Sequence, residues 1–263
     1  MDSATVGSFW DADAPAWIHM ARAGYDLCRD LLNTPAFLKM LPPVAGKRGL
    51  DIGCGEGNNT RKLAALGAVM SAVDISPNFV KAAQSFPEVG SSPIEYQVGD
   101  GQRLPFTDQQ FDFATAFMSL MDMPDVSAAL REAYRILKSG GFLQFSITHP
   151  CSDVVRHRNV RDASGAVVAL ELGGYFRGPS ERMAEWTFGA APRELSQRLG
   201  GFKVPTFRRT LSDWLNELVA VGYLLEAVHD PCPGDVEVEK EPYLQDCQVM
   251  PQFMIVQVRK PSK

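Results

Sequence analysis

The sequence is poor in the residues that build metal centres and disulfide frameworks. Its 263 residues include five cysteines and four histidines. These are scattered along the chain, and no two cysteines stand at C-x-x-C spacing. An odd number of dispersed cysteines favours free thiols over a disulfide framework or a zinc site. We therefore predict that the protein binds no metal.

A surplus of positive charge is also missing. Lysine and arginine number 26 against 31 aspartates and glutamates, which gives a net charge of -5, whereas nucleic-acid binders normally carry a basic surplus. The one basic patch, "RHRNVR" from Arg156 to Arg161, contains no aromatic residues on which bases would stack. We interpret it as a solvated loop rather than a phosphate-binding site, and we expect no nucleic-acid partner.

Long apolar runs are absent as well. The opening stretch, "MDSATVGSFWDADAP", has neither the basic start nor the apolar centre of a secretory signal. The later apolar runs are all shorter than the roughly 20 residues of a membrane-spanning helix. The sequence therefore predicts a cytoplasmic protein with no membrane partner, and we expect a monomer or a homodimer.

Apolar and helical segments alternate along much of the chain. Hydrophobic residues make up 45% of the sequence, enough for one large, elaborated domain. Near-continuous apolar strands that alternate with amphipathic helices are typical of a parallel sheet covered on both faces. The pattern therefore predicts an α/β fold. The strand-like runs are "RGLDI", "AVMSAVD", "IEYQV", "FDFATAF" and "FLQFSIT", with helical spacing at 59–66, 78–86 and 127–137.

Three further regions flank this alternation. Residues 17–41 show helical spacing with a break at Pro35, which predicts two short helices ahead of the sheet. Residues 152–206 are rich in arginine, glycine and proline and show no regular alternation. Beyond them, "TLSDWLNELVAV" predicts a helix that ends at Gly222, and "YLLEAV" and "QFMIVQV" predict two final strands.

The stretch "RGLDIGCGEGNNTR" places Gly53, Gly55 and Gly57 between a predicted strand and a predicted helix. A dinucleotide loop has the spacing G-x-G-x-x-G and holds a pyrophosphate, whereas the spacing here is G-x-G-x-G and Asp51 precedes it. A carboxylate is unfavourable beside a pyrophosphate and favourable beside the ammonium of an amino-acid moiety. The alternative is that Asp51 caps the loop through its backbone N–H groups. The loop thus favours an adenosyl cofactor over a dinucleotide.

Two more carboxylates follow neighbouring predicted strands. Asp74 ends the second strand, and Asp100 comes just after the third. A carboxylate at the first position can accept both hydroxyls of a ribose, which is common to dinucleotide and adenosyl cofactors. Asp100 can accept a hydrogen bond from the exocyclic amine of adenine, with Gly101 leaving room for the ring. A surface role is the alternative for both carboxylates, but together they indicate an adenosine site.

Five segments in register resemble the class I S-adenosylmethionine-dependent methyltransferases: "LDIGCGEGNNTR", "AVDISPNFV", "VGDGQRLPF", "FDFATAFMSLMDMPD" and "RILKSGGFLQFSITHP". The resemblance is strong over residues 46–150 and weaker over the final helix and strands. It implies a Rossmann-like, seven-stranded, mostly parallel sheet with helices on both faces and an antiparallel last strand. We divide the chain accordingly into an N-terminal helical cover (1–45), an S-adenosylmethionine-binding core (46–151 and 207–263) and an insert after the fifth strand (152–206).

The resemblance also implies a role for each loop at the carboxyl ends of the strands. The glycine loop passes beneath the methionine and ribose parts of S-adenosylmethionine, Asp74 takes the ribose hydroxyls, and Asp100 takes the adenine amine. Gln102 flanks the ring, Phe117 lies near the sulfonium, and Cys54 fills space in the loop. The expected cofactor-binding residues are Asp51, Gly53, Cys54, Gly55, Asp74, Ile75, Asp100, Gly101, Gln102 and Phe117.

The acceptor pocket is expected between the N-terminal cover and the insert. Trp17 and Tyr25 from the cover, and Tyr175 and Trp186 from the insert, are its predicted walls, while core packing is the alternative for the first two. His149 follows the fifth strand at the ligand edge of the sheet and is the predicted general base, with a structural role as its alternative.

The methionines of "FMSLMDM" have two interpretations. They can line the sulfonium pocket with polarizable groups, or Met121 and Met123 can pack in the core.

The predicted function is transfer of a methyl group from S-adenosylmethionine to a small-molecule acceptor, with S-adenosylhomocysteine as the product. The sequence leaves the acceptor atom open among nitrogen, oxygen, carbon and sulfur. One alternative is an S-adenosylmethionine-binding enzyme of a non-methylating reaction, such as a cyclisation. Another is a module that binds the cofactor without turnover, and a third is an NAD-dependent oxidoreductase.

Overall fold

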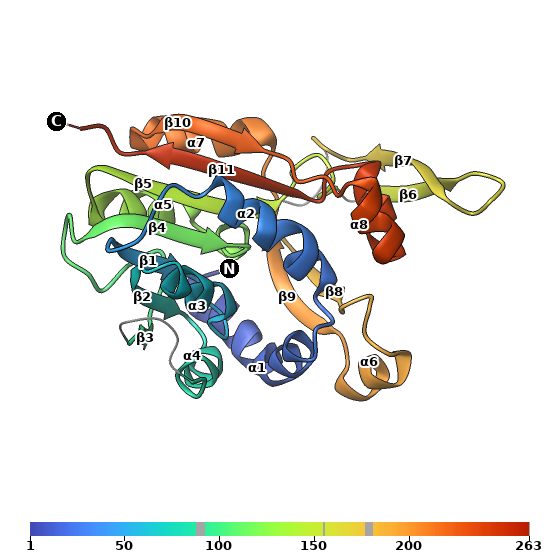
Figure 1. Ribbon diagram of the computed structural model, residues 1–263, viewed down its shortest axis with the longest axis horizontal. Helices are drawn as coiled ribbons and strands as arrows, with labels where there is room; N and C mark the ends of the chain where they lie inside the picture. The colour runs from blue at the N-terminus through green and yellow to red at the C-terminus, as the bar shows by residue number, and fades with distance from the viewer. Residues whose placement is uncertain (88–92, 155, 177–180, 263) are drawn as a thin grey trace.

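The computed structural model describes residues 1–87, 93–154, 156–176 and 181–262 (Figure 1). A seven-stranded sheet with the order β10-β11-β5-β4-β1-β2-β3 forms its centre. β11 runs antiparallel to both of its neighbours, β5 and β10, and the other neighbouring strands of the sheet pair in parallel. The predicted sheet with an antiparallel last strand is therefore confirmed. The strands are β1 (Arg48–Ile52), β2 (Val69–Asp74), β3 (Glu95–Val98), β4 (Phe111–Phe117), β5 (Leu137–Thr148), β10 (Leu224–His229) and β11 (Phe253–Arg259).

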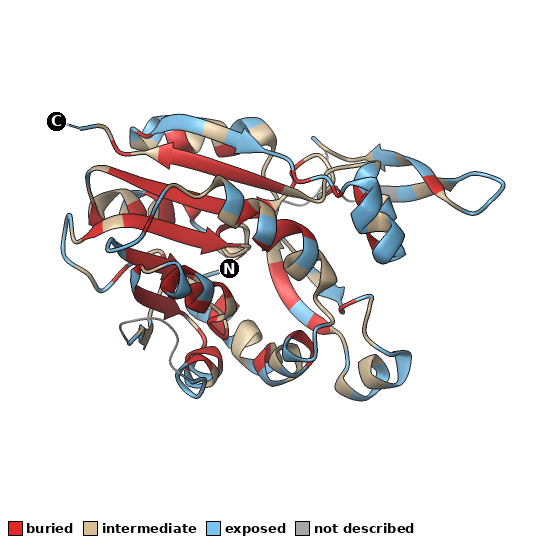
Figure 2. Cartoon of the chain, in the orientation of Figure 1, coloured by how far each residue is buried: buried red, intermediate tan, exposed pale blue. Residues whose placement is uncertain are grey.

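Helices cover both faces of the sheet, and its central strands are buried (Figure 2). Successive side chains of a strand point to opposite faces. On β5, Phe145 therefore joins the core under α5 (Val126–Ile136) and α7 (Leu211–Val221), whereas Phe142 joins the core under α2 (Thr34–Met40) and α3 (Asn58–Ala65). This two-sided core explains why the strands read as near-continuous apolar runs.

Side-chain caps begin the helices that follow the strands. Ser76 accepts a hydrogen bond from the Phe79 amide at the start of α4 (Pro77–Gln84), and Asp125 accepts one from the Ala128 amide at the start of α5. Thr210 caps α7, which ends at Gly222 with φ +101°, as predicted. These caps satisfy amides that have no partner within the helix, so the turns between strands and helices are fixed.

The N-terminal segment differs from its prediction. It forms one long helix, α1 (Ser3–Arg22), a π-helical turn, η1 (Cys28–Asn33), and the short helix α2. The prediction of a break at Pro35 was wrong, because Pro35 lies in the first turn of α2, where the missing amide has no helical partner to lose. Asp2 caps α1 by accepting a hydrogen bond from the Thr5 amide, so this helix begins well before the predicted one.

The insert forms two hairpins rather than irregular structure. The first pairs β6 (Arg156–Arg161) with β7 (Val167–Gly173), and the second pairs β8 (Glu181–Trp186) with β9 (Phe202–Phe207). A short helix, α6 (Arg193–Leu199), lies between β8 and β9. The basic stretch predicted to be a loop is therefore strand β6. Much of this hairpin is exposed (Figure 2), so its sequence lacks the apolar alternation that marks a strand.

The second hairpin packs against the N-terminal helix. Met20 and Ala21 of α1 share a buried cluster with Phe188 and Phe202 of the insert. The Lys203 amide also donates a hydrogen bond of 2.6 Å to the Asp13 carboxylate. We call α1 and the β8–β9 hairpin with α6 the cover, and Figure 1 shows it beside the ends of the strands toward which β4 points.

The connection from β10 to β11 contains α8 (Asp235–Lys240) and η3 (Pro242–Gln248), two elements that the sequence pattern did not predict. No helix within the described ranges combines the length and the apolar character needed to cross a membrane.

Candidate functional site

The glycine loop after β1 is closely packed on one side and open on the other. Gly53, Gly55 and Gly57 have φ values of +72°, +54° and +82°, a region that glycine adopts freely. The amides of Gly53 and Cys54 donate to the Val73 carbonyl at the end of β2. A Cβ on Gly53 would lie 2.3 Å from the Ser119 side chain, whereas a Cβ on Gly55 would have no heavy atom within 4 Å. The loop therefore leaves space for a ligand at Gly55.

Asp74 connects this loop to the end of β2. One carboxylate oxygen accepts a hydrogen bond from the Gly55 amide at 2.8 Å, and the other accepts one from the Ser76 amide at 2.9 Å. Burial raises the pKa of Asp74 to about 6, against the opposing effect of these amides. The carboxylate thus lies where the strand pattern predicts it, at the ligand edge of the sheet and in contact with the loop.

Asp51 lies beneath the loop and is fully buried. Its carboxylate accepts hydrogen bonds from the Thr60 hydroxyl of α3 at 2.5 Å and from the Thr115 hydroxyl of β4 at 2.9 Å. Burial raises its pKa to about 6, although the two hydroxyls act in the opposite direction. Asp51 therefore ties α3 and β4 to β1, and its partners are side chains rather than backbone amides of the loop. That Asp51 interacts with the ammonium group of a bound cofactor stays a prediction.

Asp100 and Gln102 follow β3 at the ligand edge of the sheet. Asp100 accepts hydrogen bonds from the Ser3 hydroxyl of α1 at 2.7 Å and from the Gln102 amide at 2.8 Å. The Gln102 side chain in turn accepts a hydrogen bond from the Asp125 amide at 2.6 Å. A Cβ on Gly101 would lie 2.7 Å from the Met123 methyl group, so the flexible end of this methionine fills the space beside the glycine.

Helix α1 passes over the loops that follow β2 and β3. A Cβ on Gly7 would lie 2.8 Å from Ile75, so the helix backbone lies close against this residue. Four residues along the helix, Asp11 accepts hydrogen bonds from the Ser76 hydroxyl at 2.6 Å and the Asn78 amide at 2.9 Å. The N-terminal helix therefore packs on Ile75 and contacts Asp100, two of the predicted cofactor-binding residues.

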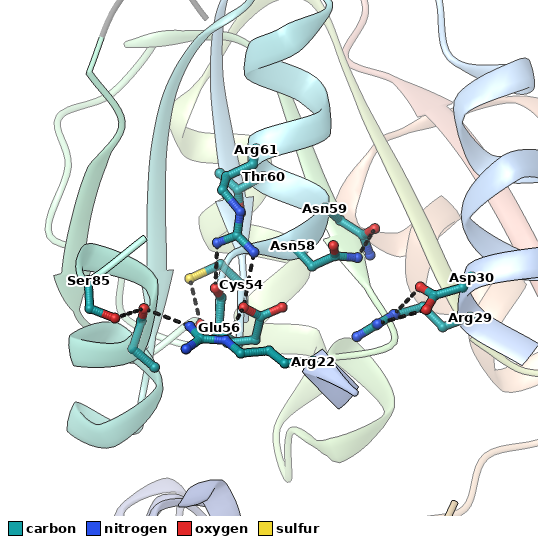
Figure 3. A network of polar contacts seen from close by, with 12 residues as sticks. Arg22, Arg29, Asp30, Cys54, Glu56, Asn58, Asn59, Thr60, Arg61 and Ser85 are labelled. Carbon is teal, nitrogen blue, oxygen red and sulfur yellow. Dashed lines mark hydrogen bonds and ion pairs between the residues drawn. The ribbon is translucent and has the colours of Figure 1, made fainter. Parts of the chain in front are cut away.

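Glu56, within the glycine loop, links the end of this helix to α3 (Figure 3). Its buried carboxylate lies 3.0 Å from the guanidinium of Arg61 and 3.3 Å from that of Arg22. Both guanidinium groups also stack on the Phe86 ring, at 3.9 and 4.5 Å from its centre. Glu56 was not among the predicted site residues, and it holds the cover onto the loop.

The end of β4 lies beside the end of β1, at the same edge of the sheet. The Phe117 ring packs against that of Phe37, with ring centres 3.8 Å apart and the planes tilted by 31°, and is largely buried. Met118 has φ +52°, an uncommon conformation for a residue with a side chain. The Ser119 hydroxyl donates to the Ile52 carbonyl at 2.6 Å and fixes the following turn, η2 (Leu120–Asp122), beside the end of β1. Met121 and Met123 pack against the core, as the packing interpretation predicted.

Asp122 ends this turn and was not predicted as a site residue. The residue is half-buried, and within the described ranges no group donates a hydrogen bond to its carboxylate. Burial and the neighbouring charge of Asp153 raise its pKa to about 8, while Arg209 acts in the opposite direction. A carboxylate just after a strand at the ligand edge is the sequence signal that could have identified it.

His149 follows β5 and is buried. Its Nδ1 accepts a hydrogen bond from the Cys151 amide at 3.1 Å, and its Nε2 lies 3.5 Å from the Asp230 carboxylate. Burial lowers the pKa of His149, partly offset by Asp230. In this arrangement the ring connects the start of the insert to the segment after β10, and its role as a base stays a prediction.

The structure brings three of the four predicted acceptor walls together in the cover. Trp17 makes edge contacts with Phe79 and Phe188, with ring centres 5.4 and 5.7 Å apart, and Tyr25 packs against the same cluster. Trp186 also contacts Phe188 and remains 39% exposed. Trp17 thus packs the core of the cover, whereas Trp186 presents a free surface.

The fourth predicted wall, Tyr175, lies elsewhere. Its hydroxyl accepts a hydrogen bond from the Leu211 amide at 2.8 Å, at the start of α7. Among the residues with a described position, no three histidine, cysteine, aspartate or glutamate side chains cluster as metal ligands.

Comparison with known proteins finds similarity to methyltransferases. Residues 50–145 match a family model described as "Methyltransferase domain". The chain is 33% identical over 149 residues to a ubiquinone biosynthesis O-methyltransferase of Xanthomonas oryzae, covering 55% of this chain and 57% of that enzyme. It is 35% identical over 114 residues to a demethylmenaquinone methyltransferase of Corynebacterium kroppenstedtii, covering 43% and 47%. The chain thus spans about half the length of these curated relatives.

A solved structure extends the likeness over most of the chain. The S-adenosylmethionine-dependent methyltransferase from Mesorhizobium loti superimposes with a TM-score of 0.69 and 28% sequence identity, covering 86% of this chain and 96% of that one.

Proposed function

We propose that the chain is a class I S-adenosylmethionine-dependent methyltransferase that transfers a methyl group from S-adenosylmethionine to a small-molecule acceptor. The product of the cofactor is then S-adenosylhomocysteine. The observation that carries this proposal is the open position at Gly55, next to the Asp74 carboxylate and on the same edge of the sheet as Asp100.

The residues present fit this cofactor. The backbone at Gly55 has free space where any side chain would project, which suits close approach of a ligand. Asp74 would accept the ribose hydroxyls, Asp100 would accept the adenine amine, and Phe117 would close the site at the end of β4. When ionised, these carboxylates accept hydrogen bonds and donate none, which matches hydroxyl and amine donors on the ligand.

In this reaction the main contribution of the protein is to position the acceptor and the cofactor. S-adenosylmethionine, when bound, supplies an activated methyl group on its sulfonium sulfur. The cover and the end of β4 would hold the acceptor in line and exclude water, and such positioning lowers the barrier of a bimolecular step by up to several kcal/mol. A base is needed only where the acceptor must lose a proton, and Asp122 and His149 are the two titratable side chains we propose for that role.

Two observations support a small-molecule acceptor. The two curated relatives are named for ubiquinone and menaquinone chemistry, which involves small molecules. The net charge of -5 also disfavours a nucleic-acid acceptor. We place the acceptor between the cover and the end of β4, with Trp186 as one wall and Tyr25 and Tyr175 as further candidates. We also propose a cytoplasmic monomer or homodimer that consists of an N-terminal helical part (1–45), a cofactor-binding core (46–151 and 207–263) and an insert (152–206).

The test begins with binding and proceeds to turnover. Calorimetry with S-adenosylhomocysteine and with NAD is expected to show binding of the first alone. The chain is then incubated with S-adenosylmethionine and a panel of phenols, catechols, amines, thiols and carboxylic acids, and release of S-adenosylhomocysteine is measured. Binding of NAD alone would contradict the proposal. Conversion of a panel compound without S-adenosylhomocysteine release would indicate a non-methylating enzyme.

A further inference from the structure

Two cysteines far apart in the sequence meet where the N-terminal and C-terminal parts of the chain pack together. Cys28 begins η1, and Cys247 lies near the end of η3. Leu32 from η1 and Leu244 from η3 are buried in the same small cluster as Cys247, and Cys28 packs against it. Each of the two turns thus contributes one leucine and one cysteine to a shared contact.

The two thiols are direct neighbours within this cluster. Their mutual interaction lowers the pKa of Cys247 and, together with burial, raises that of Cys28. Asp26 and Asp246 lie close enough to disfavour a thiolate on either sulfur, and Tyr243 is a further titratable neighbour.

The remaining cysteines lack such a partner. The Cys54 thiol contacts the Gly55 carbonyl inside the glycine loop, and the exposed Cys232 contacts the Pro233 carbonyl. Cys151 is half-buried at the start of the insert. All five cysteines are free thiols in this structure, and Cys28 with Cys247 is the pair placed for a mutual reaction.

We propose that Cys28 and Cys247 form an oxidation-sensitive pair whose disulfide fastens η1 to η3. The oxidant class is a peroxide. The Cys247 thiolate attacks one peroxide oxygen, so an S–O bond forms, the O–O bond breaks, and the leaving hydroxide takes a proton to become water. The Cys28 sulfur then attacks the sulfenic sulfur, an S–S bond forms, the S–O bond breaks, and a second water leaves. Two thiols lose two electrons in total, and the peroxide gains them.

Proximity rather than strong activation drives this reaction. Cys247 is buried, which limits access of the peroxide, so the first step is expected to be slower than at an exposed redox sensor. Once a sulfenic acid forms at Cys247, however, the second thiol is already in contact with it. The disulfide is therefore favoured over further oxidation to the sulfinic acid, which needs a second peroxide.

The crosslink would join the N-terminal segment to the connection between β10 and β11. Asn33, at the end of η1, donates a hydrogen bond of 3.1 Å to Ser146 on β5. On the other side, Asp246 of η3 accepts a hydrogen bond of 3.2 Å from Asn159 on β6. A disulfide here would therefore couple the N-terminal segment, through η3, to the first hairpin of the insert.

The test uses the full chain, reduced and then exposed to hydrogen peroxide. Non-reducing digestion and mass spectrometry are expected to show one crosslinked peptide that contains Cys28 and Cys247. Because the disulfide closes a long loop, the melting temperature is expected to rise by roughly 5–10 °C and to return on reduction. The control variant, C151S/C232S, keeps the pair and is expected to behave in the same way.

Two variants keep the outcome decisive. C28S changes the more exposed partner, and C247A changes the buried one, so at least one is expected to fold. Either variant should lose both the crosslinked peptide and the peroxide-induced shift in melting temperature. The proposal is overturned if the wild-type chain stays uncrosslinked while the exposed Cys232 is oxidised. It is equally overturned if Cys28 and Cys247 are each modified singly.

Discussion

The Asp74 carboxylate accepts a hydrogen bond from the Gly55 amide at 2.8 Å, so the end of β2 holds the most open point of the glycine loop. The same carboxylate accepts a second bond from Ser76, whose hydroxyl donates to Asp11 of the N-terminal helix. One side chain therefore connects the loop, the sheet edge and the helix that covers them. A change at Asp74 is expected to affect cofactor binding first.

Replacing Asp74 with alanine is expected to weaken S-adenosylhomocysteine binding by about tenfold to a few hundredfold. Two hydrogen bonds to a charged acceptor contribute about 1.5–3 kcal/mol each, and water compensates for part of the loss. Calorimetry measures the change. Glu239→Ala, on the exposed side of α8, is the control and should bind normally. Wild-type affinity in Asp74→Ala would remove this residue from the site.

Gly55→Val is expected to abolish S-adenosylhomocysteine binding, because the branched side chain would occupy the open space at the loop. Gly165 offers a matched control, since it also has a positive φ, +88° against +54°, and a Cβ there would likewise have no heavy atom within 4 Å. Both variants strain the backbone. Gly165→Val, in the turn between β6 and β7, should keep its affinity. Equal losses in the two variants would show that strain rather than contact is responsible.

Trp186→Ala is expected to lower the affinity for the acceptor found in the turnover panel while leaving S-adenosylhomocysteine binding intact. The side chain packs on Phe202 with ring centres 4.9 Å apart, yet 39% of it stays exposed. Phe176→Ala is the control, because this aromatic residue of the insert is 86% exposed. Steady-state kinetics and calorimetry separate the two ligands. Parallel losses of both would mean that Trp186 holds the cover together.

The sheet and the glycine loop could be predicted because their signals are local. Each central strand is buried on both faces and reads as an apolar run, and the ligand-edge carboxylates Asp74 and Asp100 stand at or just after the end of a strand. The first hairpin of the insert could not be predicted, because Arg158 of β6 pairs with Glu171 of β7 and both are exposed. A strand that is solvated on both sides carries no apolar alternation.

The properties of single site residues depended on distant parts of the chain. Asp122 stands in a stretch whose methionines are its most visible feature, but its raised pKa comes from burial and from Asp153 of the insert, with Arg209 opposing. The role of Glu56 likewise depends on Arg22, at the end of α1. Sequence spacing identifies neither Asp153 as a neighbour of Asp122 nor Arg22 as a neighbour of Glu56, because tertiary packing brings these residues together.

Asp122→Asn is expected to raise the melting temperature at pH 8–9 and to change it little at pH 4–5. The pKa of Asp122 is raised from 3.8 to about 8 in the folded chain. Between these values the folded state holds a proton that the unfolded state has released, so the contribution of Asp122 to stability falls as pH rises through this window. Asparagine stays neutral throughout. Thermal unfolding across pH measures the difference, with Glu239→Gln as an exposed control that should show none.

Asp122→Asn and His149→Ala together separate the candidate bases once an acceptor is known. If the acceptor must lose a proton and Asp122 takes it, single-turnover rates of the wild-type chain should rise with pH to about 8, where the carboxylate is ionised. Asp122→Asn should then slow turnover by about 10²–10⁴-fold and remove this pH dependence. His149→Ala should leave the pH dependence in place, because its Nδ1 already accepts a hydrogen bond from the Cys151 amide. A large rate loss in His149→Ala at unchanged thermal stability would instead assign the proton to His149. A thiolate or thioether acceptor needs no base, and both variants should then turn over at nearly the wild-type rate.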